Sequence, residues 1–122
     1  MERGIITMNE CGAVTIPSGE IWMSEMELTD LFGVIAPTVR AAIRAIYKSG
    51  VLKEYEAERC IYLPNGNSLN VFGLPMIAAL VFRIHSFGAE KVRHIILERI
   101  YKRKENIMIF LSLGGNGLQT LS

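Results

Sequence analysis

The chain has 122 residues, with 13 lysines and arginines against 12 aspartates and glutamates, so its formal net charge is +1. This length fits one domain, and a hydrophobic share of 50% is ample for a packed core. The charge balance excludes a global basic field that would announce a nucleic-acid partner. No apolar run approaches the ~18 residues needed to cross a bilayer, and the start lacks a secretory signal pattern. We expect a cytoplasmic protein without a membrane partner.

The N-terminal part alternates strand-forming residues with turn residues. Residues 4–8 and 13–16 have strand composition, and residues 9–12 between them supply a turn. They predict an N-terminal β-hairpin. Residues 21–23 form a further short extended piece, in which Trp22 is expected to be a buried ring that covers the end of the next helix.

The stretch that follows has the signals of two short helices joined by a tight turn. Ser24 and Glu27 are spaced as a capping box, in which each side chain accepts from the backbone N–H of the other residue. The first helix should end at Gly33, because glycine tolerates a left-handed backbone. Pro37 suits the first turn of a second helix, since its missing N–H would be unpaired there, and Gly50 should cap that helix. This pattern predicts a helix-turn-helix.

A second hairpin is expected after the helix pair. Residues 59–63 and 68–72 resemble strands, and Asn65 and Gly66 between them both accept positive φ, which makes a strong hairpin signal. A hairpin directly after a helix-turn-helix is typical of a winged helix.

The C-terminal part predicts helices. Residues 75–86 are apolar almost all round and predict a buried central helix, and residues 89–104 predict a last helix. The expected fold is therefore α+β: a winged helix-turn-helix core with an N-terminal β-hairpin and C-terminal helices. We expect one such domain over residues 1–106, followed by an apolar and then glycine-rich tail over residues 107–122.

The apolar segment 107–113 would be an exposed liability in a monomer. Small helix-turn-helix proteins act as two-fold dimers when two half-sites need two recognition helices. We therefore expect a homodimer formed by the last helix and the tail. In the alternative, the tail folds back as an edge strand against the N-terminal hairpin.

Catalysis has little support in the sequence. His85 and His94 lie on different predicted helices, and neither belongs to a zinc-binding motif. Cys11 and Cys60 lack CxxC spacing and are expected to be reduced. Nucleophile motifs and phosphate-binding loops are absent from the sequence. We expect no enzyme activity, no cofactor, no metal site and no small-molecule substrate.

Charge is segregated between the helices of the predicted helix-turn-helix. Acidic residues fall on the first helix, while Arg40, Arg44 and Lys48 recur every four residues on the second and so share one exposed stripe. Such a stripe can follow a phosphate backbone or send arginines to guanine edges, and in the alternative it is an ordinary solvated helix face. The candidate DNA-binding residues, with the hairpin tip included, are Thr38, Arg40, Arg44, Lys48, Asn65 and Asn67.

A set of short segments resembles a known family. The segments are Ile21–Ser24, Leu31–Val34, Ile43, Ile46–Tyr47, Gly50, Leu52, Asn65–Gly66, Leu74, Met76–Ile77, Phe82–Ser86 and Val92–Arg93. In these residues and their spacing, the chain resembles the RhuM-like virulence family over residues 5 to 104. That family is regarded as DNA-binding proteins of bacterial genomes, islands and mobile elements, so the resemblance implies a bacterial DNA-binding protein.

One departure from that family affects the expected function. Ile35, Ala36 and Pro37 stand where family members place small polar and basic residues, so that only Thr38 remains to hydrogen-bond a base edge. We expect a protein that binds double-stranded DNA, as a transcriptional regulator or a mobile-element accessory factor. The alternative is a protein–protein interaction module with a winged-helix fold that does not read DNA.

Overall fold

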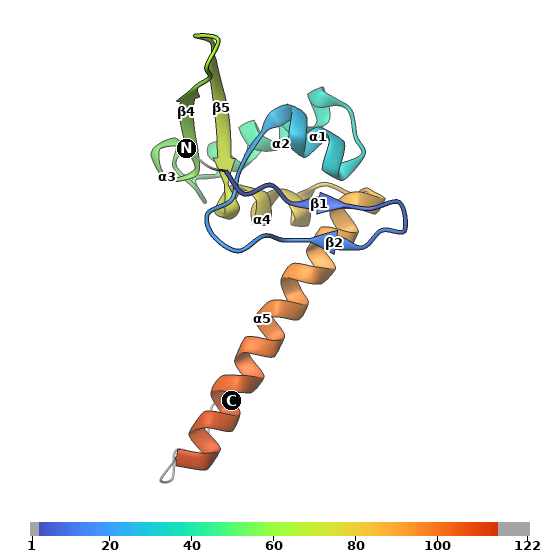
Figure 1. Ribbon diagram of the computed structural model, residues 1–122, viewed down its shortest axis with the longest axis vertical. Coiled ribbons are helices and arrows are strands. Elements are labelled where there is room, and N and C mark those ends of the chain that lie inside the picture. The colour runs from blue at the N-terminus through green and yellow to red at the C-terminus, as the bar shows by residue number, and fades with distance from the viewer. Residues whose placement is uncertain (1–2, 115–122) are drawn as a thin grey trace.

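The computed structural model describes the backbone of residues 3–114 and the side chains of residues 3–102. The elements in chain order are β1 (Thr7–Met8), β2 (Val14–Thr15), β3 (Trp22–Ser24), α1 (Glu25–Phe32), α2 (Ala36–Ser49), α3 (Glu54–Ala57), β4 (Glu58–Tyr62), β5 (Ser68–Gly73), α4 (Leu74–Arg83) and α5 (Phe87–Gly114). The fold is α+β, as expected. Figure 1 shows a body of helices and strands from which the β4–β5 hairpin extends at one end and α5 at the other.

The strands form two antiparallel sheets within the described residues. β1 pairs with β2, which confirms the N-terminal hairpin. The other sheet has the order β3-β5-β4, so the strand in front of α1 pairs with the second strand of the later hairpin. Met23 lies opposite Phe72, and Phe72 lies opposite Glu58. The sheet therefore joins the start of the helix pair to the hairpin that follows it.

Trp22 is buried, but the predicted place of its ring is wrong. Its ring lies beside Gly73, where a Cβ atom would be 3.1 Å from the indole carbons. The Arg59 guanidinium stacks over the ring at 4.3 Å from its centroid. The ring therefore covers one face of the sheet and not the end of α1, because strand alternation turns the side chain of Trp22 away from its neighbour Met23.

The hairpin turn is wider than the Asn-Gly pair predicted. The N–H of Gly66 donates to the carbonyl of Leu63 (2.9 Å), and the N–H of Leu63 donates to the carbonyl of Asn67 (2.8 Å). Gly66 has a positive φ of 88°. Asn65 does not, because positive φ occurs only at glycines among the described residues. The loop is thus a turn over Leu63–Gly66 with glycine in the left-handed position, and Pro64 suits its second residue.

Helix α4 is shorter and less buried than predicted. Its backbone leaves the helical region at Ile84 (φ −92°, ψ 128°), although this residue's N–H still donates to the Leu80 carbonyl (2.8 Å). Leu80 and its neighbours on one side are buried, whereas Phe82 is exposed. The predicted central helix is therefore confirmed, but it ends earlier than expected and one of its sides is exposed.

Helix α5 is longer than predicted, because it continues past residue 104 to Gly114. The alternative of an edge strand at 107–113 is wrong, since this backbone is helical. The glycine-rich stretch 115–122 of the predicted tail lies outside the described residues. Near its start, α5 passes so close to α1 that a Cβ atom on Gly88 would collide with the Leu31 carbonyl oxygen.

The core lies between α1, α2, α4, the start of α5 and one face of the three-stranded sheet. Its largest fully buried side chains are Ile6, Met23, Leu28, Phe32, Val39, Met76, Ile77, Leu80, Val81 and Val92. Within the part of the chain that the structure describes, no helix has both the length and the apolar composition needed to cross a membrane.

Candidate nucleic-acid interface

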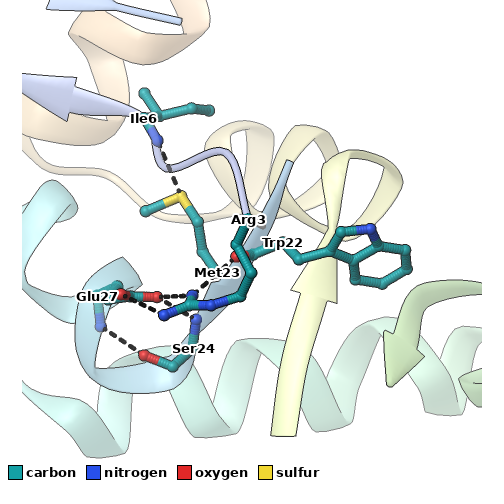
Figure 2. A network of polar contacts seen from close by, with 6 residues as sticks. All are labelled: Arg3, Ile6, Trp22, Met23, Ser24 and Glu27. Carbon is teal, nitrogen blue, oxygen red and sulfur yellow. Dashed lines mark hydrogen bonds and ion pairs between the residues drawn. The ribbon is translucent and has the colours of Figure 1, made fainter. Parts of the chain in front are cut away.

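The capping box predicted at the start of α1 is present. The N–H of Glu27 donates to Ser24 Oγ (3.2 Å), and the N–H of Ser24 donates to Glu27 Oε1 (2.8 Å). Figure 2 shows that Arg3 completes this network. Its guanidinium donates to Glu27 Oε1 (2.6 Å), to Glu27 Oε2 (3.2 Å) and to the carbonyl of Trp22 (3.0 Å). The N-terminal segment therefore fixes the entry into the helix pair.

The network changes the acidity of Glu27. Burial by itself would raise the pKa of this carboxyl group. The hydrogen bonds from Arg3 and Ser24, together with the positive charge of Arg3, outweigh burial and hold the pKa below its ordinary value. Because a lowered pKa means that folding favours the ionised group, the network stabilises the fold above the ordinary pKa of glutamate. That contribution is lost as the pH falls through the lowered value.

We expect Glu27→Gln to lower the free energy of unfolding by about 0.5–1.5 kcal/mol at neutral pH, the net contribution of a typical hydrogen bond, because glutamine can still accept from the Ser24 N–H but lacks the charge that binds Arg3. The difference from the unchanged protein should shrink in acid, because there Glu27 is protonated in both folded and unfolded chains. Urea unfolding at neutral and acidic pH measures both quantities. Asp30→Asn, an exposed site on the same helix, is the control. A Glu27→Gln deficit that is equal at both pH values would contradict the stabilising role of the network.

The turn between α1 and α2 is formed by the residues that the sequence indicated. Gly33 is left-handed (φ 66°, ψ 38°), and its N–H donates back to Thr29 and Asp30. Pro37 lies in the first turn of α2, and Gly50 caps its end. One face of α2 is buried against the body, through Val39, Ala42, Ile43 and Ile46. The opposite, exposed face carries Pro37, Thr38, Ala41, Arg44 and Lys48. We call these five exposed residues the α2 face.

Arg40 lies at the border of the α2 face and is engaged by α1. Its Nη2 donates to Glu25 Oε1 at 2.7 Å and its Nε to Glu25 Oε2 at 3.5 Å. Arg44 and Lys48 form no ion pair within the part of the chain whose side chains are described. The predicted stripe of three cations is therefore divided into one neutralised arginine and two cations that face solvent.

The β4–β5 hairpin presents a second polar surface that the sequence reasoning missed. The register pairs Tyr62 with Ser68 and Cys60 with Asn70, and paired residues of an antiparallel ladder share a face. All of these side chains are exposed, and the tyrosine is 81% exposed. The available signal was the two-residue period of a strand, which places Cys60 and Tyr62 on one side of β4. We call Cys60, Tyr62, Ser68 and Asn70 the hairpin face.

The hairpin face lies on the same side of the sheet as the contact that joins the sheet to α2. Tyr47 of α2 donates its hydroxyl hydrogen to Glu58 Oε1 (2.9 Å), and Glu58 precedes Cys60 by two residues on β4. Burial, then the hydrogen bond to Glu58 and its negative charge, raises the pKa of Tyr47 far above its ordinary value. The hydrogen bond from this phenol attaches the end of α2 to the base of the hairpin.

The hairpin tip is exposed and uncharged. Asn65 Oδ1 accepts from the N–H of Asn67 (3.0 Å), so the first asparagine organises the turn. Both asparagines are exposed, as is Thr38 at the start of α2. The predicted DNA-binding residues thus lie in two groups, on α2 and at the hairpin tip.

The histidines and cysteines considered for chemistry form no common site. His85 follows α4 and is exposed, and His94 lies on α5, 3.7 Å from Glu98. Both cysteines are free and exposed. In the region with described side chains, no group of three or more His, Cys, Asp or Glu residues is placed to hold a metal ion.

Comparisons with known proteins add no relative: the chain matches no protein-family model, and no curated protein or solved structure matches it significantly. The resemblance to the RhuM-like family stays a prediction that rests on the segments quoted above.

Proposed function

We propose that this chain is a double-stranded DNA-binding protein in which α1, α2 and the β4–β5 hairpin form a winged helix-turn-helix. In this proposal α2 is the recognition helix and the hairpin is the wing. The observation that carries it is the α2 face, which presents Arg44 and Lys48 to solvent beside a hairpin attached to the end of the same helix. Cations at this spacing can neutralise successive phosphates along one strand.

The composition of the two surfaces favours contacts to the DNA backbone over reading of the base sequence. Thr38 is the polar side chain near the start of α2, and its neighbours Ile35 and Pro37 offer only apolar contacts, as to thymine methyl groups. The hairpin face and its tip add hydroxyl and amide groups without positive charge. Such groups donate to phosphate and sugar oxygens. We therefore expect modest sequence discrimination.

The resemblance to the RhuM-like family supports the same proposal and suggests a bacterial setting. A protein with this composition would act in the cytoplasm without a cofactor, as a transcriptional regulator or as an accessory factor of a mobile element.

A second candidate function is docking of another protein, and exposed apolar residues favour it. Met26 on α1 is 75% exposed, and Ile35 at the start of α2 is 68% exposed. Apolar side chains in such positions are typical of protein-binding surfaces when they form a continuous patch. In this alternative the winged-helix shape is kept and base readout is lost.

Binding to random duplex DNA at a series of salt concentrations tests the proposal. We expect affinity to fall steeply with salt, with a slope of about −0.9 in log–log form for each phosphate neutralised. Selection from a pool of random duplexes, run in parallel, reports any preferred site. Absence of duplex binding at low salt would contradict the proposal, and binding that ignores salt would favour the docking alternative.

A further inference from the structure

Helix α5 begins inside the body of the molecule and then leaves it. Ala89 and Val92 are buried, and Ile96 packs partly against the core. From Leu97 to Lys102 every side chain is exposed. Figure 1 shows this half of the helix extending away from the body, at the end opposite to the β4–β5 hairpin. The extension therefore has no neighbour within the described part of the chain.

One side of the extension is apolar. Leu97, Ile100 and Tyr101 are 47%, 60% and 65% exposed, and their spacing places them on one side of the helix. Together with His94 and Glu98 they line a shallow, almost wholly apolar hollow. We call Leu97, Ile100 and Tyr101 the α5 seam.

The spacing of the seam residues is repeated in the sequence that follows them. After positions 97 and 100, the residues at 104, 107 and 111 are Lys, Ile and Leu. These steps of three and four residues are the heptad spacing of a coiled coil that carries one charged position. Arg99 and Lys102 fall on the opposite side of the helix and are exposed. A helix packed along the seam would leave these two cations in water.

We infer that a second copy of this chain covers the seam, so that two chains pair through their α5 helices. Helices in proteins owe most of their stability to packing of an apolar face, and among the described residues of one chain the part of α5 beyond the body has no such packing. From Leu97 to Gly114 the helix is about 27 Å long, and two such helices side by side bury on the order of 1,000 Å², the size at which specific interfaces begin.

A second copy of the chain also explains the single exposed seam better than an unrelated partner does. In a two-fold pair the same surface of both chains is covered, so one contact covers the seam of both chains. Because α5 and the β4–β5 hairpin extend from opposite ends of the body, pairing through α5 leaves the hairpin uncovered (Figure 1). The inference goes beyond the proposed function, since it concerns a different surface.

The mass of the full chain in solution without DNA, measured by light scattering, tests this inference. We expect twice the mass of one chain. The double variant Leu97→Glu with Ile100→Glu should have the mass of one chain and should lose part of its helical circular dichroism. Because these side chains lie outside the core, the thermal transition of the body should persist. The matched control, Arg99→Ala with Lys102→Ala, alters the other side of the same turns and should stay paired.

Several outcomes would overturn the inference. A monomeric mass for the unchanged chain at about 100 μM would overturn it, because this concentration populates any pair with a dissociation constant well below it. A seam variant that keeps the doubled mass would place the contact elsewhere. A monomer that sediments with anionic lipid vesicles through the seam would make the occupant a membrane surface. None of these outcomes affects salt-dependent duplex binding, so this inference and the proposed function fail separately.

Discussion

Replacing Leu80 by aspartate should abolish the folded state. Leu80 is fully buried in the middle of α4, among core side chains from several elements. Truncating such a leucine to alanine costs about 2–5 kcal/mol, and burying an unpaired carboxylate adds several kcal/mol more. The sum reaches the whole stability of a typical domain, about 5–15 kcal/mol. We expect Leu80→Asp to be insoluble or to show no cooperative thermal transition.

Phe82→Asp is the matched control, because Phe82 lies on the same helix and is 53% exposed. It should keep a cooperative transition close to that of the unchanged protein. A soluble Leu80→Asp variant with the same transition as the unchanged protein would show that α4 is not the centre of the core.

The second large effect is expected on DNA binding. Changing Arg44 and Lys48 together to alanine should weaken binding to all duplex sequences alike, because phosphate contacts carry no sequence information. If each side chain neutralises one phosphate, the log–log dependence on salt should become less steep by about two units. Fluorescence anisotropy of a labelled duplex over a range of salt concentrations measures both changes.

The control removes as much charge from another place. Arg99→Ala with Lys102→Ala lowers the net charge equally but lies on α5, so the salt dependence should stay as it is. Arg40→Ala should have a smaller effect than Arg44→Ala, because Glu25 already neutralises Arg40. Unchanged binding in the Arg44 and Lys48 double variant would favour the protein-docking alternative.

The parts of the fold that depend on residues close together in the sequence could be predicted. The capping box at Ser24 and the left-handed glycines at positions 33 and 50 are local signals, so the ends of α1 and α2 followed from them. Pairing of β3 with β5 could not be predicted in this way. Met23 and Phe72 are far apart in the sequence, and their register depends on packing of the whole core.

The extent of α5 was missed for a related reason. Residues 107–113 are apolar on every side, so they show no helical period that would have indicated a continued helix. The end of α4 was misplaced because Ile84 is apolar and buried like the helix before it, although its backbone is extended.

For the candidate site, helical periodicity correctly placed Arg44 and Lys48 on the exposed side of α2. The ion pair between Arg40 and Glu25 could not be predicted, because it depends on the angle at which α1 and α2 cross. The hairpin face could have been predicted, since strand alternation places Tyr62 and Cys60 on the same side of β4. The sequence did not indicate on which side of the sheet α2 lies.

The close approach at Gly88 has a consequence for a pair of chains. The two backbones are in contact at this point, since a Cβ atom added to Gly88 would lie only 2.8 Å from the Phe32 Cα. No flexible side chain therefore separates α5 from the end of α1 at Gly88. The direction of α5 is thereby fixed relative to that of α1, which packs against α2. If two chains pair through α5 and α2 binds DNA as proposed, the two α2 helices would be held at a fixed distance from each other. Such a dimer would bind two DNA half-sites only when they lie at one particular spacing. Its choice among DNA sequences would then depend on this spacing more than on contacts to the bases.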